Sequence, residues 1–432
     1  MSERSSDSAA PELTQDTRAF EPWYVAQAVT GLVWLAGGIF LLPAYLGSLA
    51  VSPADIGLIM SMIGVGALTS PVLGGFADRQ LAHRGVQQVG LVAFILGAIG
   101  FGLAEQTLTF AVSAMLIGFG QGAVMTVNSA LLQGAGLQPA VLSRKFANLQ
   151  SMLVVGQAIG LLLISVGTSL ELAYTSMFWA LAALAVVGLV ATVASNAAPV
   201  DRLHEAMRRG GATSGASAST DADSPTTGAV PGTEPSGLKA LLASALGLFL
   251  LTVLITQSGQ LALETQYPLY MDDVFGVGPS VTSAALSLMV VLSLLAFGPV
   301  GRLMGARGPL PVWLVVLVAR IAGSAGLLIL ALLSDVPAAV FPLLMYLVLI
   351  LSYPFLNTGG PDLAVRVSTV SPGTAAGAFF GTLAVCSIVG PSLGGWIAST
   401  YGFEYLPWAV LVGAALGLVI VLVGLVPRMA RR

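Results

Sequence analysis

Residues 56–104 read IGLIMSMIGVGALTSPVLGGFADRQLAHRGVQQVGLVAFILGAIGFGLA. Two apolar runs, each about as long as the hydrocarbon core requires, flank a short loop that holds Asp78, Arg79 and Arg84. Such alternation is typical of helices that cross a membrane in opposite directions, because the charged loop stays in water. This stretch predicts an all-α membrane protein.

The composition extends this prediction to the whole chain. Of the 432 residues, 56% are hydrophobic and only 9% are charged, whereas soluble domains carry about 25% charged residues. Twelve membrane-spanning helices need about 240 apolar residues, and 56% of 432 is about 242. The net charge of −3 gives no reason to expect a nucleic-acid partner.

Apolar segments recur along the chain with short polar breaks, and twelve are expected. They are placed at Trp23–Leu46, Ile56–Ala77, Val86–Ala104, Leu108–Leu132, Phe146–Gly167, Tyr174–Ser195, Ala240–Met271, Val281–Leu303, Val312–Leu333, Val336–Asn357, Ala375–Ser399 and Tyr405–Val426.

A long polar gap divides these segments six and six. Residues 210–237 are rich in Ser, Thr, Gly, Ala and Pro, which is typical of a flexible linker. We therefore expect a polar tail (1–20), a six-helix bundle (21–197), a linker (198–238), a second bundle (239–427) and a short tail (428–432). Residues 202–209 are expected to form either a short surface helix or a solvated stretch.

The placement of Lys and Arg predicts the orientation, because cytoplasmic loops carry an excess of these residues. Of the 17 basic residues, all but Arg320 fall on one side of the expected spans. The opposite loops contain no Lys or Arg. Their charged residues are all acidic: Asp55, Glu105, Glu171, Asp272, Asp273, Asp335 and Glu404. Both termini are expected to be cytoplasmic, in the plasma (cell inner) membrane.

The two halves resemble each other. Residues 51–54 (VSPA) open the second segment, and residues 277–280 (VGPS) open the eighth. In the first of these, Ser52 and Asp55 are spaced as in a capping box around Pro53. The pairs Gly156/Gly160 and Gly390/Gly394, in the fifth and eleventh segments, are small-xxx-small patterns that let helices approach closely. A duplicated six-helix unit is typical of transporters with a site between the halves.

The loop at residues 74–84 (GGFADRQLAHR) resembles the signature loop of the major facilitator superfamily, and with the 6+6 layout this resemblance covers about residues 23–427. It implies two pseudo-symmetric six-helix bundles and a conformational latch made by Gly74, Asp78, Arg79 and Arg84. In the latch, Asp78 would face the start of the eleventh segment near Thr374. The loop departs from the family pattern at Leu81 and Ala82, where the family favours glycine and a basic residue.

Polar residues line one face of the seventh segment. Gln257, Gln260, Glu264 and Tyr267 are spaced by three and four residues, which favours a wet cavity over simple packing. Because burial favours the neutral form of a carboxyl group, Glu264 is the leading candidate for a proton carrier. An interfacial position in contact with outside water is the alternative.

Arg320 is the only basic residue expected deep within a span. It either pairs with Glu264 or with a substrate anion, or extends back to the cytoplasmic surface. Further candidates for the substrate cavity are polar or aromatic side chains that share helix faces: Gln27, Trp34, Gln121, Met125, Asn128, Tyr346, Tyr353 and Asn357. Asp362 and Arg366 are expected to form an i,i+4 surface pair.

These residues favour a monomeric secondary transporter of a small organic solute, coupled to protons, with efflux of an amphipathic compound slightly preferred. Uptake of a neutral metabolite such as a sugar or nucleoside, by symport or facilitated diffusion, is the alternative. No His or Cys cluster suggests a metal or another cofactor. An intramembrane enzyme and a non-transporting sensor are remote alternatives, since no catalytic arrangement occurs in the spans.

Overall fold

The computed structural model describes residues 20–133, 139–202, 204–205, 244–333, 339–368 and 372–430. Within them, 12 helical spans are long and apolar enough to cross a membrane, as predicted. The expected tail (1–20), apart from Phe20, and most of the expected linker lie outside the described residues. Of the expected surface helix, Arg202, His204 and Glu205 are described and helical.

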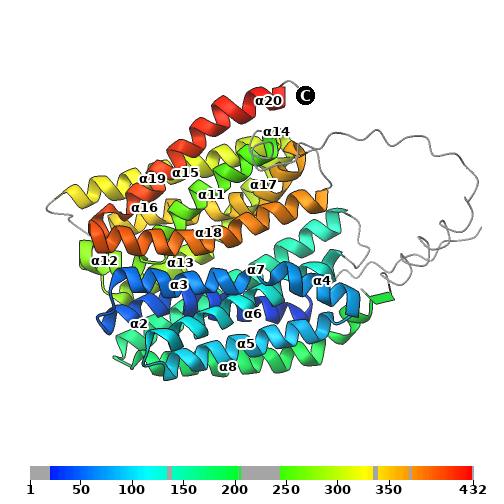
Figure 1. Ribbon diagram of the computed structural model, residues 1–432, viewed down its shortest axis with the longest axis horizontal. Helices are drawn as coiled ribbons and strands as arrows, with labels where there is room; N and C mark the ends of the chain where they lie inside the picture. The colour runs from blue at the N-terminus through cyan, green and yellow to red at the C-terminus, as the bar shows by residue number, and fades with distance from the viewer. Residues whose placement is uncertain are drawn as a thin grey trace, which may run out of the picture.

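The first six spans form the N-terminal bundle (Figure 1). The first span combines α1 (Val25–Thr30) with a π-helical stretch (Gly31–Leu41) and α2 (Leu42–Ser48). The others are α3 (Pro53–Ala67) continued by α4 (Ser70–Gln80), α5 (His83–Leu103), α6 (Thr107–Gln133), α7 (Pro139–Ser169) and α8 (Tyr174–Ser195).

The last six spans form the C-terminal bundle. They are α11 (Ala245–Glu264) followed by α12 (Tyr267–Phe275), α13 (Pro279–Ser293) followed by α14 (Phe297–Arg307), α15 (Pro309–Leu332), α16 (Val340–Ile350) with α17 (Ser352–Val367), α18 (Pro372–Thr400), and α19 (Leu406–Val419), which leads through a π-helical stretch (Ile420–Leu425) to α20 (Val426–Ala430).

Local sequence signals explain several helix boundaries. Ser52 caps α3, with its Oγ accepting a hydrogen bond from the Asp55 amide at 3.2 Å, which confirms the predicted cap. The seventh span was expected to be continuous to Met271, but its helix ends at Glu264. Pro268 is the physical reason, because it lacks an amide proton and its ring opposes the carbonyl of Glu264 four residues earlier.

The predicted small-residue patterns lie at close helix contacts in both bundles. A Cβ atom on Gly156 would lie 1.8 Å from the Ala28 carbonyl oxygen, and one on Gly394 would lie 2.2 Å from that of Ala262. The fifth span therefore packs against the first, and the eleventh packs against the seventh in the same way. This equivalence supports the expected pseudo-symmetry of the two bundles.

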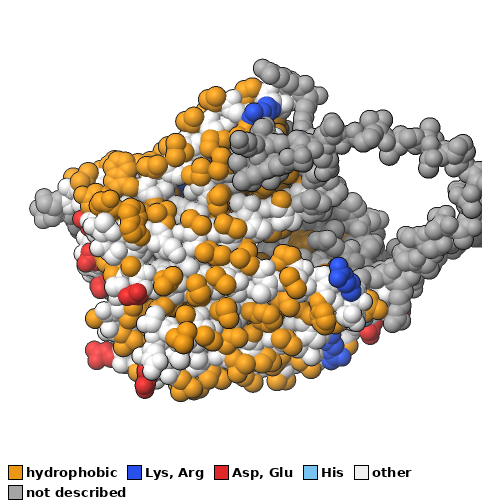
Figure 2. Space-filling view, in the orientation of Figure 1, with side chains coloured by type: hydrophobic (Ala, Val, Ile, Leu, Met, Phe, Trp, Pro, Cys, Tyr) orange, Lys and Arg blue, Asp and Glu red, His pale blue; other side chains and the backbone are white. Residues whose placement is uncertain are grey.

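Charged residues separate to the two ends of the molecule (Figure 2). The end that carries the described Lys and Arg residues other than Arg320 is called the basic end. The opposite end, called the acidic end, carries Asp55, Glu105, Glu171, Asp272, Asp273 and Glu404. A largely hydrophobic surface lies between them, as expected for a band in contact with lipid.

Candidate functional site

The bundles touch along two helix pairs near the acidic end. α3 packs on α18, where Ser61 Oγ donates to the Ile388 carbonyl at 2.8 Å. A Cβ on Gly57 would lie 3.0 Å from the Gly395 Cα, so the two backbones are in contact. α7 packs on α13, where Ser287 Oγ donates to the Ala158 carbonyl at 3.1 Å.

The same helix faces separate toward the basic end. At Gly75 on α4, which continues the span of Gly57 and Gly64, no atom of the described residues lies within 4 Å of the position that a Cβ would take. Gly377 and Gly381 on α18 and Gly298, Gly301 and Gly305 on α14 are equally open. Among the described residues, the helices of the two bundles are therefore packed together at the acidic end and are not in contact at these glycines of the basic end.

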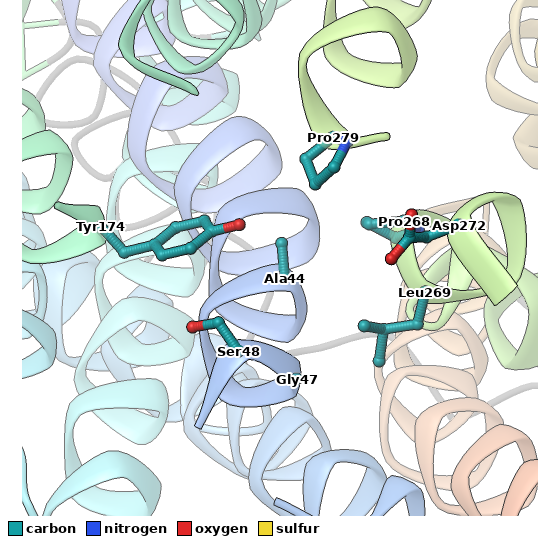
Figure 3. Close-up of a pocket in the computed structure, with 8 residues that line it drawn as sticks. All are labelled: Ala44, Gly47, Ser48, Tyr174, Pro268, Leu269, Asp272 and Pro279. Atoms are coloured by element: carbon teal, nitrogen blue, oxygen red, sulfur yellow. The ribbon is translucent and has the colours of Figure 1, made fainter. Parts of the chain in front are cut away.

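A small cavity of about 170 Å3 lies between the bundles at the closed acidic end (Figure 3). Tyr174 of α8 directs its hydroxyl toward this cavity, and Asp272 of α12 lies on the opposite wall. The neighbouring Asp273 is partly desolvated, and burial together with the charges of Glu404 and Asp272 raises the pKa of its carboxyl group. The closed end therefore carries a concentration of negative charge.

The C-terminal bundle holds a polar network around Arg320. This side chain is fully buried, so it does not extend back to the surface. Its guanidinium donates to Gln257 Oε1 at 2.6 Å and to the Thr256 carbonyl at 3.1 Å. Nε lies 3.5 Å from Ser352 Oγ. Sequence reasoning missed Ser352, because a serine next to a helix break carries no distinctive pattern.

Tyr353 connects Arg320 to Glu264. Its ring centroid lies 6.0 Å from the guanidinium carbon of Arg320, and its hydroxyl donates a short hydrogen bond to Glu264 Oε2. Arg320 and Glu264, both in the described part of the chain, do not form a direct ion pair. The tyrosine therefore lies between the buried cation and the carboxyl group.

Aromatic and amide side chains extend this network toward the acidic end. Tyr267 stacks on Tyr346 with ring centroids 3.5 Å apart, and both side chains are buried. Gln260 is fully buried, and neither its amide nitrogen nor its oxygen has a partner among the described residues. The predicted polar face of the seventh span is thus directed into the C-terminal bundle.

The N-terminal candidates fall into two groups. Gln27 and Asn128 are buried in a ladder of amides: Asn128 Nδ2 donates to Gln27 Oε1 at 2.7 Å, and Gln87 Nε2 donates to Asn128 Oδ1 at 2.6 Å. Asn196 Nδ2 in turn donates to Gln87 Oε1 at 2.8 Å. The second group is partly exposed: Trp34, Gln121 and Met125.

The signature loop lies at the basic end, where α4 is followed by α5. Asp78 Oδ1 accepts a hydrogen bond from His83 Nε2 at 2.9 Å, and Arg84 donates to the Val193 carbonyl at 3.0 Å. Leu81 adopts a left-handed conformation with φ 50°.

On α17, Asp362 and Arg366 form the predicted i,i+4 pair at 2.9 Å. Asn357 is exposed on the same helix.

Among the residues that the structure describes, no group of three or more His, Cys, Asp or Glu side chains is arranged to hold a metal ion.

Two packed helical bundles that contact at one end and separate at the other, with polar groups buried at mid-height, define the class of secondary transporters.

The chain belongs to the major facilitator superfamily, whose family model matches residues 23–384. The fold is similar to that of the nucleoside transporter NupG, with 17% identity, a TM-score of 0.68, and coverage of 93% of this chain and 97% of that one. A POT family transporter in complex with 5-aminolevulinic acid gives 14% identity, a TM-score of 0.69, and coverage of 94% and 96%. Among curated proteins, none matches the sequence significantly.

Proposed function

We propose that the protein couples the movement of a small organic solute to that of protons by alternating access, with Glu264 as the proton-binding group. The hydrogen bond from Tyr353 to Glu264, beside the buried Arg320, carries this proposal. Glu264 is the last residue of α11, and its side chain is half-buried. A carboxyl group within a membrane span is costly to keep, by up to roughly 2.5–3.5 kcal/mol at the centre on insertion scales. A role in coupling accounts for that cost.

The network supports two charge states of Glu264. When Glu264 is ionised, the Tyr353 hydroxyl stabilises its charge by donation, and Arg320 supplies a compensating positive charge nearby. When Glu264 is protonated, Arg320 keeps its hydrogen bonds to Gln257 and the Thr256 carbonyl. Proton binding thus changes the net charge of the bundle without breaking its packing.

We place the solute between the bundles, in the space that opens toward the basic end. Its proposed contacts on the N-terminal bundle are Trp34, Gln121 and Met125, with Gln27 and Asn128 behind them. On the C-terminal bundle they are the half-buried Tyr353 and the exposed Asn357, with the buried Gln257, Gln260, Tyr267 and Tyr346 behind them. Amides and aromatic faces suit an amphipathic compound, and we propose its efflux. The basic end is then cytoplasmic in the plasma membrane, and Gly74, Asp78, Arg79 and Arg84 act as the latch.

Uptake of a neutral metabolite is the second candidate. The half-buried ring of Tyr353 is aromatic surface of the kind that holds a sugar or a base. The fold is also similar to that of a protein named a nucleoside transporter.

The test uses the full chain in liposomes that contain a pH-sensitive dye, with the membrane potential clamped. Uridine, a dipeptide and tetraphenylphosphonium are added outside in turn. A change in luminal pH that accompanies solute entry supports coupling: alkalinisation indicates antiport, and acidification indicates symport. Solute entry without any pH change would contradict coupling, and the absence of movement of every probe would count against these solute classes.

A further inference from the structure

Two histidines meet at the basic end of the N-terminal bundle. His83, the first residue of α5, is 1% exposed. Its Nδ1 lies 3.2 Å from Nε2 of His204, which comes from the segment that follows α8 and leads into the linker. Its Nε2 lies 2.9 Å from Asp78 Oδ1. Asp78, His83 and His204 are together called the histidine clasp.

The carboxylate decides where the protons lie. An ionised carboxylate can only accept hydrogen bonds, so His83 Nε2 carries a proton and donates it to Asp78. In neutral His83, Nδ1 is then an acceptor, and His204 Nε2 must donate to it. One proton therefore occupies the space between the rings, and the tautomers of both histidines follow from the position of Asp78.

The clasp accommodates one additional proton but not two. With one added proton, a single N–H still lies between the rings, and a positive charge faces Asp78 in a charge-assisted hydrogen bond. With two added protons, an N–H from each ring would point at the other across 3.2 Å, and two cations would repel each other. The contact with His204 is then lost.

Asp78 lies beside the helix face that must move when the basic end closes. Gly75 is part of the open face of α4, and Asp78 is one turn away with a side chain that is 59% exposed. Closing brings this face toward α18, so the surroundings of Asp78 change between the two states. A stronger bond to His83 holds Asp78 in the arrangement of the open state.

We propose that His83 and His204 are positioning residues for the transport cycle, which hold Asp78 through a shared proton and make the opening of the basic end depend on cytoplasmic pH. The inference does not require Glu264 to carry the coupled proton. It requires only that the bundles alternate between two states.

Other charged groups lie near the histidine clasp. They are Arg79 on α4, Arg84 on α5, Arg202, which pairs with Glu21 at 3.2 Å, and Glu205 beside His204. Arg84 is bonded to the Val193 carbonyl and Arg202 to Glu21. Histidine is the residue type among these whose ordinary titration range lies between about pH 5 and 8.

The experiment measures the opening of the basic end with spin labels at Ala147→Cys on α7 and Arg302→Cys on α14. Cys386→Ala removes the native thiol, and Glu264→Gln removes the pH response of that carboxyl group. No solute is added. In this doubly labelled parent protein, the ratio of molecules with the long distance to molecules with the short distance should rise about twofold to fivefold as the pH falls from 8.5 to 5.5, as for an exposed ion pair.

Two variants of His83 give opposite expectations. In the His83→Gln variant, the open fraction should not depend on pH, and it should equal the fraction that the parent shows at pH 8.5. His83→Arg places a permanent cation opposite Asp78. In this variant the open fraction should again not depend on pH, and it should equal the fraction that the parent shows at pH 5.5. His204→Gln, which still donates to Nδ1, should retain the step of the first proton. Asp201→Asn, an exposed carboxylate nearby, should leave the profile unchanged.

An unchanged pH profile in both His83 variants would overturn the proposal. So would a parent in which the distance distribution is the same at pH 5.5 and pH 8.5. Because the distances are measured without solute or proton gradient, failure here is distinct from failure of the proposed coupled transport.

Discussion

Arg320 is a buried cation whose hydrogen bonds go to an amide, a backbone carbonyl and a hydroxyl. Neutral partners satisfy its donors but do not cancel its charge. Glu264, reached through Tyr353, is the carboxyl group that supplies the opposite charge within the same bundle. At the scale of single residues, the free energy of this bundle therefore depends on whether Glu264 carries a proton.

Glu264→Gln should abolish proton-driven solute accumulation and leave solute exchange intact. Glutamine keeps the size of the side chain and accepts from Tyr353, but it cannot release a proton. Proton-driven accumulation should fall by about a hundredfold or more, as for loss of an essential proton-transfer group. Counterflow of labelled solute in liposomes checks that exchange survives.

Asp362→Asn is the matched control, because this carboxylate lies on the surface and pairs with Arg366. It should show normal accumulation. Undiminished accumulation by the Glu264→Gln variant would exclude Glu264 as the proton carrier.

Sequence spacing predicted which residues share a face, but not what each one contacts. The line from Gln257 to Tyr267 was visible from its period, since a helix repeats every 3.6 residues. The partners Ser352 and Tyr353 come from another span, and no spacing rule relates the seventh span to the tenth. Gln27 and Asn128 were equally visible as polar residues, yet their amide ladder depends on how four helices meet.

At the scale of elements, the backbone is strained where α4 ends and the loop to α5 begins. Leu81 adopts φ 50° and ψ 40° at the end of α4, a left-handed conformation that costs an L-residue with a Cβ roughly 1–2 kcal/mol. The family pattern has glycine at this position, and the structure supplies the physical reason for that preference.

Leu81→Gly should therefore stabilise the protein. Relief of the left-handed strain outweighs the greater freedom of glycine in the unfolded chain, so the net gain should be about 0.5–1 kcal/mol. Thermal unfolding in detergent should show a higher midpoint. Leu73→Gly, in the middle of α4, is the contrasting control and should lower it. A lower midpoint for Leu81→Gly would contradict the strain.

The contact between α3 and α18 depends on glycine. A Cβ on Gly57 would lie 2.4 Å from the Pro391 carbonyl oxygen, and the neighbouring atoms are backbone that cannot rotate away. The acidic end therefore cannot close around a larger residue at this position.

Gly57→Val should shift the protein toward the state that is open at the acidic end. A cysteine at Ser392, in the contact with Ser61, should react with a membrane-impermeant thiol reagent at least tenfold faster in the Gly57→Val variant. Gly75→Val is the matched control, because no described residue lies within 4 Å of its Cβ position, and it should not increase the labelling. Equal labelling in the Gly57→Val variant and its parent would contradict the glycine contact.

At the scale of the whole molecule, the sequence was most informative. Hydrophobic length alone predicted twelve spans, because each helix must satisfy its backbone within the lipid, and the described part of the chain contains 12 helical spans of that length and composition. The break after Glu264 was missed, since Pro268 lies inside an otherwise apolar run. The state that is open at the basic end could not be predicted, because one sequence encodes both states.

Membrane orientation is a property of the whole chain, and it can be tested through the linker. A cysteine at Ser217, placed in a Cys386→Ala background, should be labelled by an impermeant reagent only after the cytoplasmic side of the membrane is exposed. The Glu171→Cys variant, with its cysteine at the acidic end, should be labelled from outside in intact cells. Labelling of the linker from outside would reverse the proposed orientation.

The most direct test of alternating access measures both ends of the same protein. One spin-label pair, Ala147→Cys and Arg302→Cys, spans the basic end; another, Ala54→Cys and Thr400→Cys, spans the acidic end. Alternating access predicts opposite changes: conditions that shorten the first distance lengthen the second, and without solute the first is long and the second short. Two distances that change together, or an acidic end that never opens, would contradict it.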